Sequence, residues 1–417
     1  MTINTLHEKY SQYYLVDTDT RNIRKNTIFF ALKGNKFNGN KFAQEAIKKG
    51  AKYAVIDDPR YASDNTILVD DVLETLQELA KYHRIQLDIP IISLTGSNGK
   101  TTTKELIASV LKQKYKVTAT KGNLNNHIGV PLTLLSMTPA TEIGIVEMGA
   151  NHQKEIEFLC SIALPNFGYI TNFGKAHLEG FGGVDGVIKG KSELYDYLRA
   201  ANGTVFVNSN DEIQIKQSKG ILNIVSFEPT LEYLEANPFV KLYFHQEPIN
   251  SNLIGSYNYN NIAAALTIGN HFKVDIEKAK AAISNYTPSN NRSQIIEKNN
   301  FNIVLDAYNA NPSSMEVALK NYALNNPNGS IILGDMFELG NSSLKEHQAT
   351  AELAVFLGFK NIALVGQNFY RVRIKKALKF ERFEDFIKSD AFKQFQNQPL
   401  FIKGSRGMAL ERTLDFL

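Results

Sequence analysis

A glycine-rich segment near residue 100 constrains this chain more than any other stretch. It reads Thr95-Gly96-Ser97-Asn98-Gly99-Lys100-Thr101-Thr102, between an apolar run at 91–94 and a helical pattern at 106–111. A strand, a glycine-rich turn and a helix N-terminus form a phosphate cradle, because backbone N–H groups and the positive end of the helix dipole face the anion. Lys100 would reach the terminal phosphates of a nucleotide, and the Thr101 hydroxyl would ligate Mg²⁺. We expect ATP binding, although Leu94 replaces the first glycine of the usual spacing; the alternative is a polar turn that contains a lysine.

Composition excludes several other classes of protein. A chain of 417 residues is too long for one ordinary core and suggests two or three domains. The net charge of +4 gives no support for a nucleic-acid or membrane surface, and no apolar stretch could span a bilayer. The single cysteine, Cys160, excludes an internal disulfide and fits a reducing cytoplasm. We therefore expect a cytoplasmic protein with neither nucleic acid nor membrane as a partner. We also expect it to act as a monomer.

Strand-like runs alternate with amphipathic stretches along the chain, and this order predicts an α/β fold with largely parallel sheets. The alternation divides into three blocks, at residues 1–87, 88–289 and 290–417. The densest basic run, at 371–379, is expected to form the solvent-exposed face of a helix. We expect strands at 27–32, 53–56, 143–146, 167–171, 303–305, 330–333, 363–365 and 400–402, and helices at 41–49, 72–82, 192–198 and 258–269.

Polar side chains follow several of these strands, where ligands bind in open α/β sheets. Glu147 ends the strand at 143–146 and can hold Mg²⁺ directly or through water; the alternative is a helix cap or a solvated strand end. His177 follows the next strand. A lone histidine is more often structural than a ligand, but this position favours a metal or phosphate contact. Lys189 and Lys191 by themselves indicate only a basic surface segment.

Two asparagine-rich segments allow two interpretations each. The first, at 123–127, precedes Gly129-Val130-Pro131; such a cluster is usually a turn, and it can also bind amides or phosphates. The second, at 306–314, follows a strand, and its Pro312 and serines are helix-start signals. Its Asp and Asn residues can be simple caps. The density of donors and acceptors at a strand end favours a ligand site instead.

Taken together, these motifs resemble the Mur ligases. TGSNGKTT, EMGA (147–150), TNFGKAHLEGFG (171–182), GKSELY (190–195), SYNYNNIAAA (256–265), DAYNANPSS (306–314), LGDMFELG (333–340) and KGSR (403–406) occur in that family's order across the whole chain. The N-terminal segment resembles the uridine-nucleotide-binding domain shared by two of its members. Within the family, DAYNANP is similar to the ligases that add D-alanyl-D-alanine to UDP-N-acetylmuramoyl-tripeptide. The alternatives are a diamino-acid-adding Mur ligase or a folylpolyglutamate synthase, and the third-block motif is the discriminating feature.

The resemblance implies three domains that act together in peptidoglycan precursor synthesis. Residues 1–87 would hold the UDP end of the substrate, and 88–289 would form a central P-loop-type ATP-binding domain. Residues 290–417 would form a Rossmann-like domain that closes over the incoming amine. The implied reaction is ATP-driven amide formation, in which the tripeptide carboxylate attacks the γ-phosphate to give an acyl phosphate. The amine of D-alanyl-D-alanine then displaces phosphate.

The resemblance also implies roles for individual residues. Lys100, His177 and Lys191 would be catalytic, and Lys191 would be carbamylated. Tyr257 and Asn291 depart from the family, which has histidine and glycine there. Mg²⁺ would be held by Thr101, Glu147, His177 and Lys191; ATP by Gly96, Asn98, Gly99, Lys100, Thr101, Thr102, Asn258, Asn261, Arg292 and Asp306; and the two substrates by Thr20, Arg21, Asn126, His127, Asn309, Asn311 and Ser314.

Overall fold

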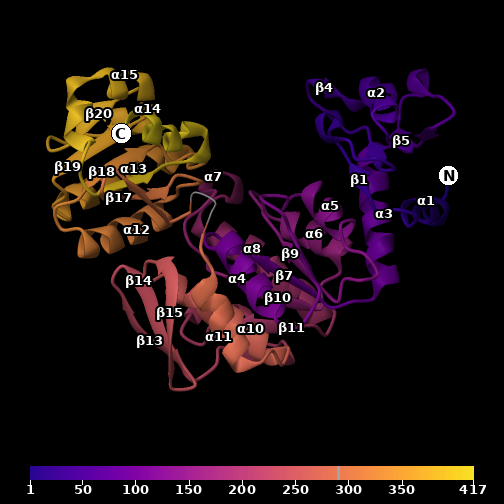
Figure 1. The fold of residues 1–417 in the computed structure, drawn as a ribbon, viewed down its shortest axis with the longest axis horizontal. Helices are drawn as coiled ribbons and strands as arrows, with labels where there is room; N and C mark the ends of the chain where they lie inside the picture. The colour runs from indigo at the N-terminus through magenta and orange to yellow at the C-terminus, as the bar shows by residue number, and fades with distance from the viewer. Residues whose placement is uncertain (289–291) are drawn as a thin grey trace.

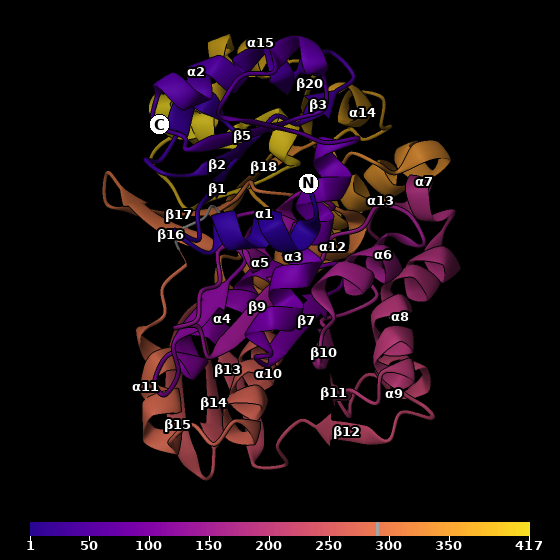
Figure 2. The ribbon, with the colours of Figure 1, turned by 90° about the vertical axis from the view of Figure 1, so that its right-hand side faces the viewer.

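The computed structural model describes residues 1–288 and 292–417, and the chain forms three lobes (Figure 1). Figure 1 shows the N-terminal and C-terminal lobes on opposite sides of the middle lobe, and Figure 2 shows the same lobes from the side. The expected boundary at 289/290 and the departure at Asn291 lie outside the described residues. The expected α/β fold is confirmed. Within the described residues, no helix is long and apolar enough to cross a membrane.

The first lobe is a four-stranded parallel sheet with the order β1-β2-β5-β6. The long helix α3 (Val72–Leu87) leaves this sheet and packs against helices of the middle lobe, so it joins the two lobes. Its N-cap is Asp71, whose side chain accepts from Glu74 N. The other elements are α1 (Ile3–Tyr10), β1 (Val16–Asp17), β2 (Ile28–Phe30), β3 (Lys33–Gly34), β4 (Phe37–Asn38), α2 (Ala43–Lys48), β5 (Tyr53–Ile56) and β6 (Thr66–Leu68).

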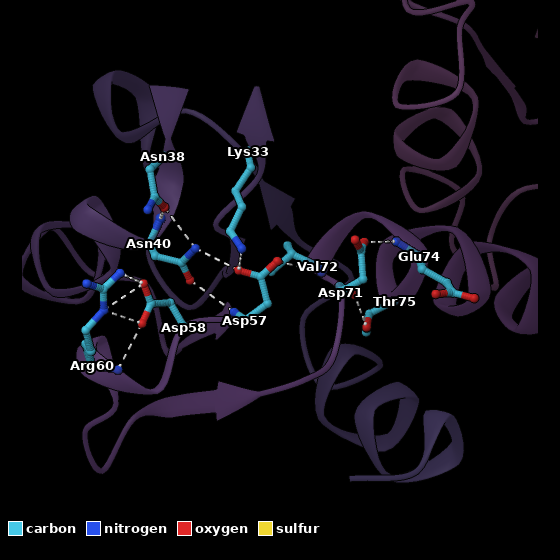
Figure 3. Close-up of polar contacts among 10 residues, drawn as sticks. All are labelled: Lys33, Asn38, Asn40, Asp57, Asp58, Arg60, Asp71, Val72, Glu74 and Thr75. Carbon is cyan, nitrogen blue, oxygen red and sulfur yellow. Dashed lines mark hydrogen bonds and ion pairs between the residues drawn. The ribbon is translucent and has the colours of Figure 1, made fainter. Parts of the chain in front are cut away.

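A polar network around Asp57 fixes the start of α3 against the first sheet (Figure 3). Asp57 follows β5 and accepts from Lys33 Nζ at 2.8 Å, from the buried Asn40 Nδ2 at 2.8 Å and from Val72 N at 3.4 Å. Desolvation alone would raise the pKa of Asp57, but the hydrogen bonds from Lys33 and Asn40 hold it below its ordinary value. The carboxylate therefore ties the β3–β4 hairpin and α3 to one strand end.

The middle lobe is a six-stranded parallel sheet with the order β12-β11-β10-β7-β9-β8. The central strand β7 is buried along its whole length. One face is covered by α4, α10 and α11, and α5, α6 and α8 cover the other. The strands are β7 (Ile91–Thr95), β8 (Val117–Ala119), β9 (Ile143–Glu147), β10 (Phe167–Ile170), β11 (Thr204–Val207) and β12 (Asn223–Ser226); the helices are α4 (Lys100–Leu111), α5 (Gly129–Leu134), α6 (Glu155–Ala163), α7 (Leu178–Phe181), α8 (Val184–Ala200), α9 (Glu212–Gln217), α10 (Asn258–His271) and α11 (Ile276–Asn285).

A small antiparallel sheet packs beside α10 and α11. The sequence patterns did not predict it. It consists of β13 (Leu231–Ala236), β14 (Phe239–Phe244) and β15 (Glu247–Ile254). The inward-facing Val240, Leu242 and Phe244 alternate with more exposed residues, which is the pattern of a half-buried strand.

The third lobe is a six-stranded sheet with the order β16-β17-β21-β18-β19-β20, parallel except at the β16–β17 pair. Helices cover both faces, as in Rossmann-like folds. The strands are β16 (Gln294–Lys298), β17 (Phe301–Asp306), β18 (Ser330–Gly334), β19 (Asn361–Val365), β20 (Leu378–Phe380) and β21 (Leu400–Lys403); the helices are α12 (Pro312–Asn325), α13 (Ser343–Phe356), α14 (Gln367–Tyr370) and α15 (Phe383–Lys388).

The prediction of a helix at the basic run 371–379 is wrong. Helix α14 ends at Tyr370, the next residues form a loop, and Leu378–Phe380 pair with β19 as an edge strand. Val372 is buried, and Lys379 Nζ donates to its carbonyl at 2.9 Å. Pairing with β19 and burial of Val372 outweigh the local helical pattern.

Candidate active site

A cavity of about 1080 Å³ lies between the middle and third lobes. It brings most of the expected site residues together from both lobes. Four of them do not line it: Thr20, Arg21, Gly96 and Lys191. Those that line it are Asn98, Gly99, Lys100, Thr101, Thr102, Asn126, His127, Glu147, His177, Asn258, Asn261, Arg292, Asp306, Asn309, Asn311 and Ser314.

The phosphate loop is held from behind by the segment 171–174, which we call the strap. Thr171 Oγ1 donates to Asn98 O at 2.6 Å, and Ser97 Oγ donates to Gly174 O at 2.6 Å. Gly96 has a φ of +141°, and a Cβ added there would lie 2.0 Å from Thr171 Oγ1. Only glycine fits this position, because both the backbone angle and the approach of the strap exclude a side chain.

Lys100 begins α4 and lies folded over the loop. Its Nζ donates to Gly96 O at 2.6 Å. Burial lowers the pKa of Lys100; the nearby Glu147 carboxylate raises it, and the positive charge of Arg292 lowers it further. The amine therefore lies among the charges that would surround a nucleotide's phosphates.

Glu147 ends β9 as a buried carboxylate with three side-chain neighbours. Its oxygens accept from Thr101 Oγ1 at 3.0 Å and from Asn125 Nδ2 at 2.8 Å, and Lys104 Nζ lies 3.5 Å away. Among the described residues, no group of three or more His, Cys, Asp or Glu side chains gathers as a metal site. A carboxylate and a hydroxyl fit one Mg²⁺ that takes its other ligands from phosphates and water. Sequence reasoning missed Asn125 and Lys104 as partners of this carboxylate.

His177 and Lys191 contact partners other than Glu147. His177 precedes α7 in the left-handed conformation, and its Nδ1 contacts the carboxylate of Glu338 in the third lobe. A hydrogen bond from His177 lowers the pKa of Glu338. Lys191 lies within α8, is 1% exposed and donates from Nζ to Ala150 O at 3.2 Å. Burial lowers its pKa well below the ordinary value, so a surface role for Lys191 is excluded.

The start of α10 forms another wall of the cavity. Asn258 Nδ2 donates to Ile254 O at 2.8 Å, and Asn261 Nδ2 donates to Asn258 Oδ1 at 2.7 Å. Tyr257, which departs from the family, is hydrogen bonded through its hydroxyl to Ser293 Oγ at 2.5 Å. Because Ser293 immediately precedes β16, the hydrogen bond between Tyr257 and Ser293 links the start of α10 to the third lobe.

The third-lobe wall is built on the end of β17. Asp306 pairs with Lys403 Nζ at 2.5 Å and accepts from Ser293 N at 3.2 Å. Lys403 also donates to Asn309 O at 3.1 Å. It lines the cavity and was not among the expected site residues, although its place at a strand end was a signal.

Asn311 and Ser314 form a reciprocal capping box at the start of α12. The cap interpretation of this segment therefore holds for both residues. Asn311 Nδ2 also donates to Asn98 Oδ1 at 2.7 Å. One side chain thus caps a third-lobe helix and contacts the phosphate loop across the cavity.

In the first asparagine segment, the turn interpretation also has a structural basis. Asn126 Oδ1 accepts from Ile128 N at 3.1 Å and from Gly129 N at 2.9 Å, which fixes the turn that leads into α5. His127 O accepts from Gln77 Nε2 of α3 at 2.9 Å. The segment therefore contacts α3 while its side chains line the cavity.

Thr20 and Arg21 lie in the first lobe, outside this cavity. The side chain of Arg21 is 84% exposed and pairs with Asp19 at 2.6 Å. The hydrogen bonds from Arg21 lower the pKa of Asp19 to about 2. Lys49 Nζ donates to Thr20 O at 2.9 Å, which fixes this turn against α2.

A phosphate loop, a buried carboxylate and a Rossmann-like lobe facing them across a cavity define a nucleotide-dependent ligase. Family models match the chain in three consecutive pieces: "Mur ligase family, catalytic domain" at residues 12–84, "Mur ligase middle domain" at 94–269 and "Mur ligase, glutamate ligase domain" at 291–397. The chain belongs to the Mur ligase family, whose members are ATP-dependent ligases.

Relatives and solved structures resemble the chain over nearly its whole length. The UDP-N-acetylmuramoyl-tripeptide–D-alanyl-D-alanine ligase of Bacillus subtilis is 31% identical, over 95% of this chain and 91% of the relative. A crystal structure of MurF from Acinetobacter baumannii superposes with a TM-score of 0.87 at 29% identity, covering 99% of this chain and 98% of that one. MurF from Thermotoga maritima in complex with ADP gives a TM-score of 0.83 at 26% identity, covering 96% of each chain.

Proposed function

We propose that this chain joins D-alanyl-D-alanine to UDP-N-acetylmuramoyl-tripeptide, with conversion of ATP to ADP, in peptidoglycan precursor synthesis and thereby in cell shape and division. The observation that carries the proposal is the position of the segment 306–314. It forms the third-lobe wall of the cavity and bonds to the phosphate loop through Asn311. The names of the relatives, which align with nearly the whole chain, support the same substrates.

The side chains suit the two halves of an amide-forming reaction. The tripeptide carboxylate would attack the γ-phosphate of ATP to give an acyl phosphate and ADP. Phosphoryl transfer needs positive charge and positioning more than covalent help, and Lys100 and Arg292 supply positive charge. The dipeptide amine would then attack the acyl carbon, with phosphate as the leaving group. We assign Asn309, Asn311 and Ser314 to the dipeptide side and Asn126 and His127 to the tripeptide side.

We propose Thr101 and Glu147 as the residues that hold a Mg²⁺ ion, which when bound would neutralise charge on the transferred phosphate. His177 and Lys191 are proposed for a second ion. Burial keeps the Lys191 amine in the neutral form more readily than an exposed lysine, and a neutral amine is the form that reacts with CO₂ to give a carbamate. Carbamylation would convert this buried amine into an oxygen ligand of the kind Mg²⁺ prefers.

We propose that the three lobes divide the work, with 1–87 for the UDP part, 88–289 for ATP and 290–417 for the incoming amine. In this scheme, Gly96, Asn98, Gly99 and Thr102 hold phosphates, and Asn258 and Asn261 hold the base. Thr20 and Arg21 serve the uridine nucleotide. A monomer suffices, because one chain supplies both walls of the cavity. A cytoplasmic location fits the need for ATP and the free thiol of Cys160.

The test is phosphate release from ATP by the purified chain with a panel of acceptors and amines. We expect release with UDP-N-acetylmuramoyl-tripeptide plus D-alanyl-D-alanine, and little release when either is omitted. The matched alternatives are UDP-N-acetylmuramoyl-dipeptide with a diamino acid, and a folate with glutamate. Turnover with either alternative pair, and none with the tripeptide pair, would assign the chain to another branch of the family.

A further inference from the structure

Tyr308 lines the cavity and contacts two guanidinium groups. The Cζ atom of Arg292 lies 3.7 Å from the centroid of its ring, and that of Arg406 lies 5.2 Å from it. Arg406 Nη1 also donates to the Tyr308 hydroxyl at 3.3 Å. The three residues come from the start of β16 and the ends of β17 and β21, which are neighbours in the sheet. The Tyr308 ring therefore contacts both guanidinium cations.

Arg292 is the member of this cluster that faces the phosphate loop. It lines the cavity together with Lys100, and its charge contributes to the lowered pKa of Lys100. Within the described part of the chain, its Nε is buried without a hydrogen-bond partner. A guanidinium carries its donors in one plane, so stacking on an aromatic ring fixes the direction in which they point. The contact with Tyr308 thus determines how Arg292 presents its donors to the cavity.

We propose that Tyr308 is a positioning residue, whose ring holds the Arg292 guanidinium flat so that it can bind the terminal phosphates of ATP. Arg406 packs near the same ring and restrains it through the hydroxyl. This inference rests on the proposed ATP contact of Arg292. It assigns Tyr308 no direct contact with substrate: the ring acts through the guanidinium stacked on it.

The test is nucleotide binding by the full chain, measured by calorimetry with a non-hydrolysable ATP analogue and with AMP. Because the ring directs the guanidinium that would bind the terminal phosphates, Tyr308→Leu should weaken binding of the ATP analogue roughly 10-fold. AMP, which lacks the terminal phosphates, should bind the variant as it binds the parent. Tyr308→Phe keeps the stacked ring and should restore binding of the analogue to within about twofold.

A double-mutant cycle separates positioning from a direct contact. Arg292→Met should weaken the ATP analogue, and adding Tyr308→Leu to it should cause little further loss. Tyr370→Leu is the matched control, because Lys379 Nζ lies 5.7 Å from that ring and Tyr370 does not line the cavity. Equal losses of affinity for AMP and for the ATP analogue would show that Tyr308 stacks on the base. Additive losses in the double mutant would show that Tyr308 and Arg292 bind the nucleotide independently. Either result overturns the proposal. Nucleotide binding needs no muramoyl substrate, so failure of dipeptide addition would be a separate result.

Discussion

Replacing Gly96 by alanine tests whether the strap fixes the phosphate loop in its binding conformation. The added Cβ would lie 2.0 Å from Thr171 Oγ1 and 3.0 Å from Thr171 N. Thr171 cannot simply turn away, because its hydroxyl donates to Asn98 O at 2.6 Å. In addition, the φ of +141° at Gly96 is a backbone conformation that alanine rarely adopts. The loop must therefore shift, lose the strap's hydrogen bond, or do both.

The expected loss of ATP affinity can be estimated from two costs, one for the backbone angle and one for the lost hydrogen bond. A strained backbone angle costs about 1–3 kcal/mol, and loss of a hydrogen bond costs about 1 kcal/mol. Their sum, about 2–4 kcal/mol, corresponds to a roughly 30- to 1000-fold loss of ATP affinity if the strain is relieved by moving the loop. The same two costs together set an upper limit of about 4 kcal/mol on the loss of global stability.

The assay is binding of a non-hydrolysable ATP analogue, paired with thermal unfolding. Gly34→Ala is the control, because a Cβ there meets nothing within 4 Å and its φ is not positive. We expect that control to bind like the parent chain. A Gly96→Ala protein that binds ATP within about threefold of the parent would refute the reasoning, since it would mean that the loop tolerates the displaced strap.

Four further outcomes are expected. Lys100→Ala should lower phosphate release on the order of 10²- to 10³-fold with unchanged circular dichroism, while Lys112→Ala at the end of the same helix should act like the parent. Lys191→Ala should be nearly inactive and partly rescued by acetate, whereas Lys189→Ala should retain activity; full activity of Lys191→Ala would refute the carbamate. Burial lowers the pKa of His83 to about 4. The fold therefore favours the neutral form of His83. The free energy of unfolding should fall by at most about 3 kcal/mol as the pH drops from about 6.5 towards 4. Urea titrations of His83→Gln should lack this pH dependence. Small-angle scattering should show compaction when nucleotide and muramoyl substrate bind, and identical dimensions would contradict domain closure.

Strong local patterns were sufficient to predict much of the fold. The strand expected at 53–56 coincides with β5, and those at 143–146 and 400–402 differ from β9 and β21 by one residue. Buried parallel strands are continuous apolar runs, so they are easy to recognise. The antiparallel sheet β13–β15 was missed because its strands are half-exposed, so polar residues interrupt their apolar runs. The basic run was misread because the pairing of β20 with β19 depends on distant sequence.

The candidate site shows the same division between local and distant information. The glycine spacing and strand ends marked the positions of Lys100, Glu147 and Asp306. Spacing could not show that Lys104 lies 3.5 Å from Glu147, or that Lys191 is buried rather than exposed. Those facts depend on which helix faces pack inward, and a single local sequence does not determine them.

The segment after β10 links the phosphate loop to the third lobe. Thr171 and Asn172 bond to the loop from behind. Three residues after Asn172, the backbone N of Lys175 donates to Ser313 Oγ at 2.8 Å, and the Lys175 Nζ lies 3.2 Å from Glu346 Oε1. One short stretch therefore contacts both the phosphate loop and the third lobe. We therefore expect a bound nucleotide that displaces the loop to disturb contacts that also hold the third lobe, which would couple ATP binding to lobe closure.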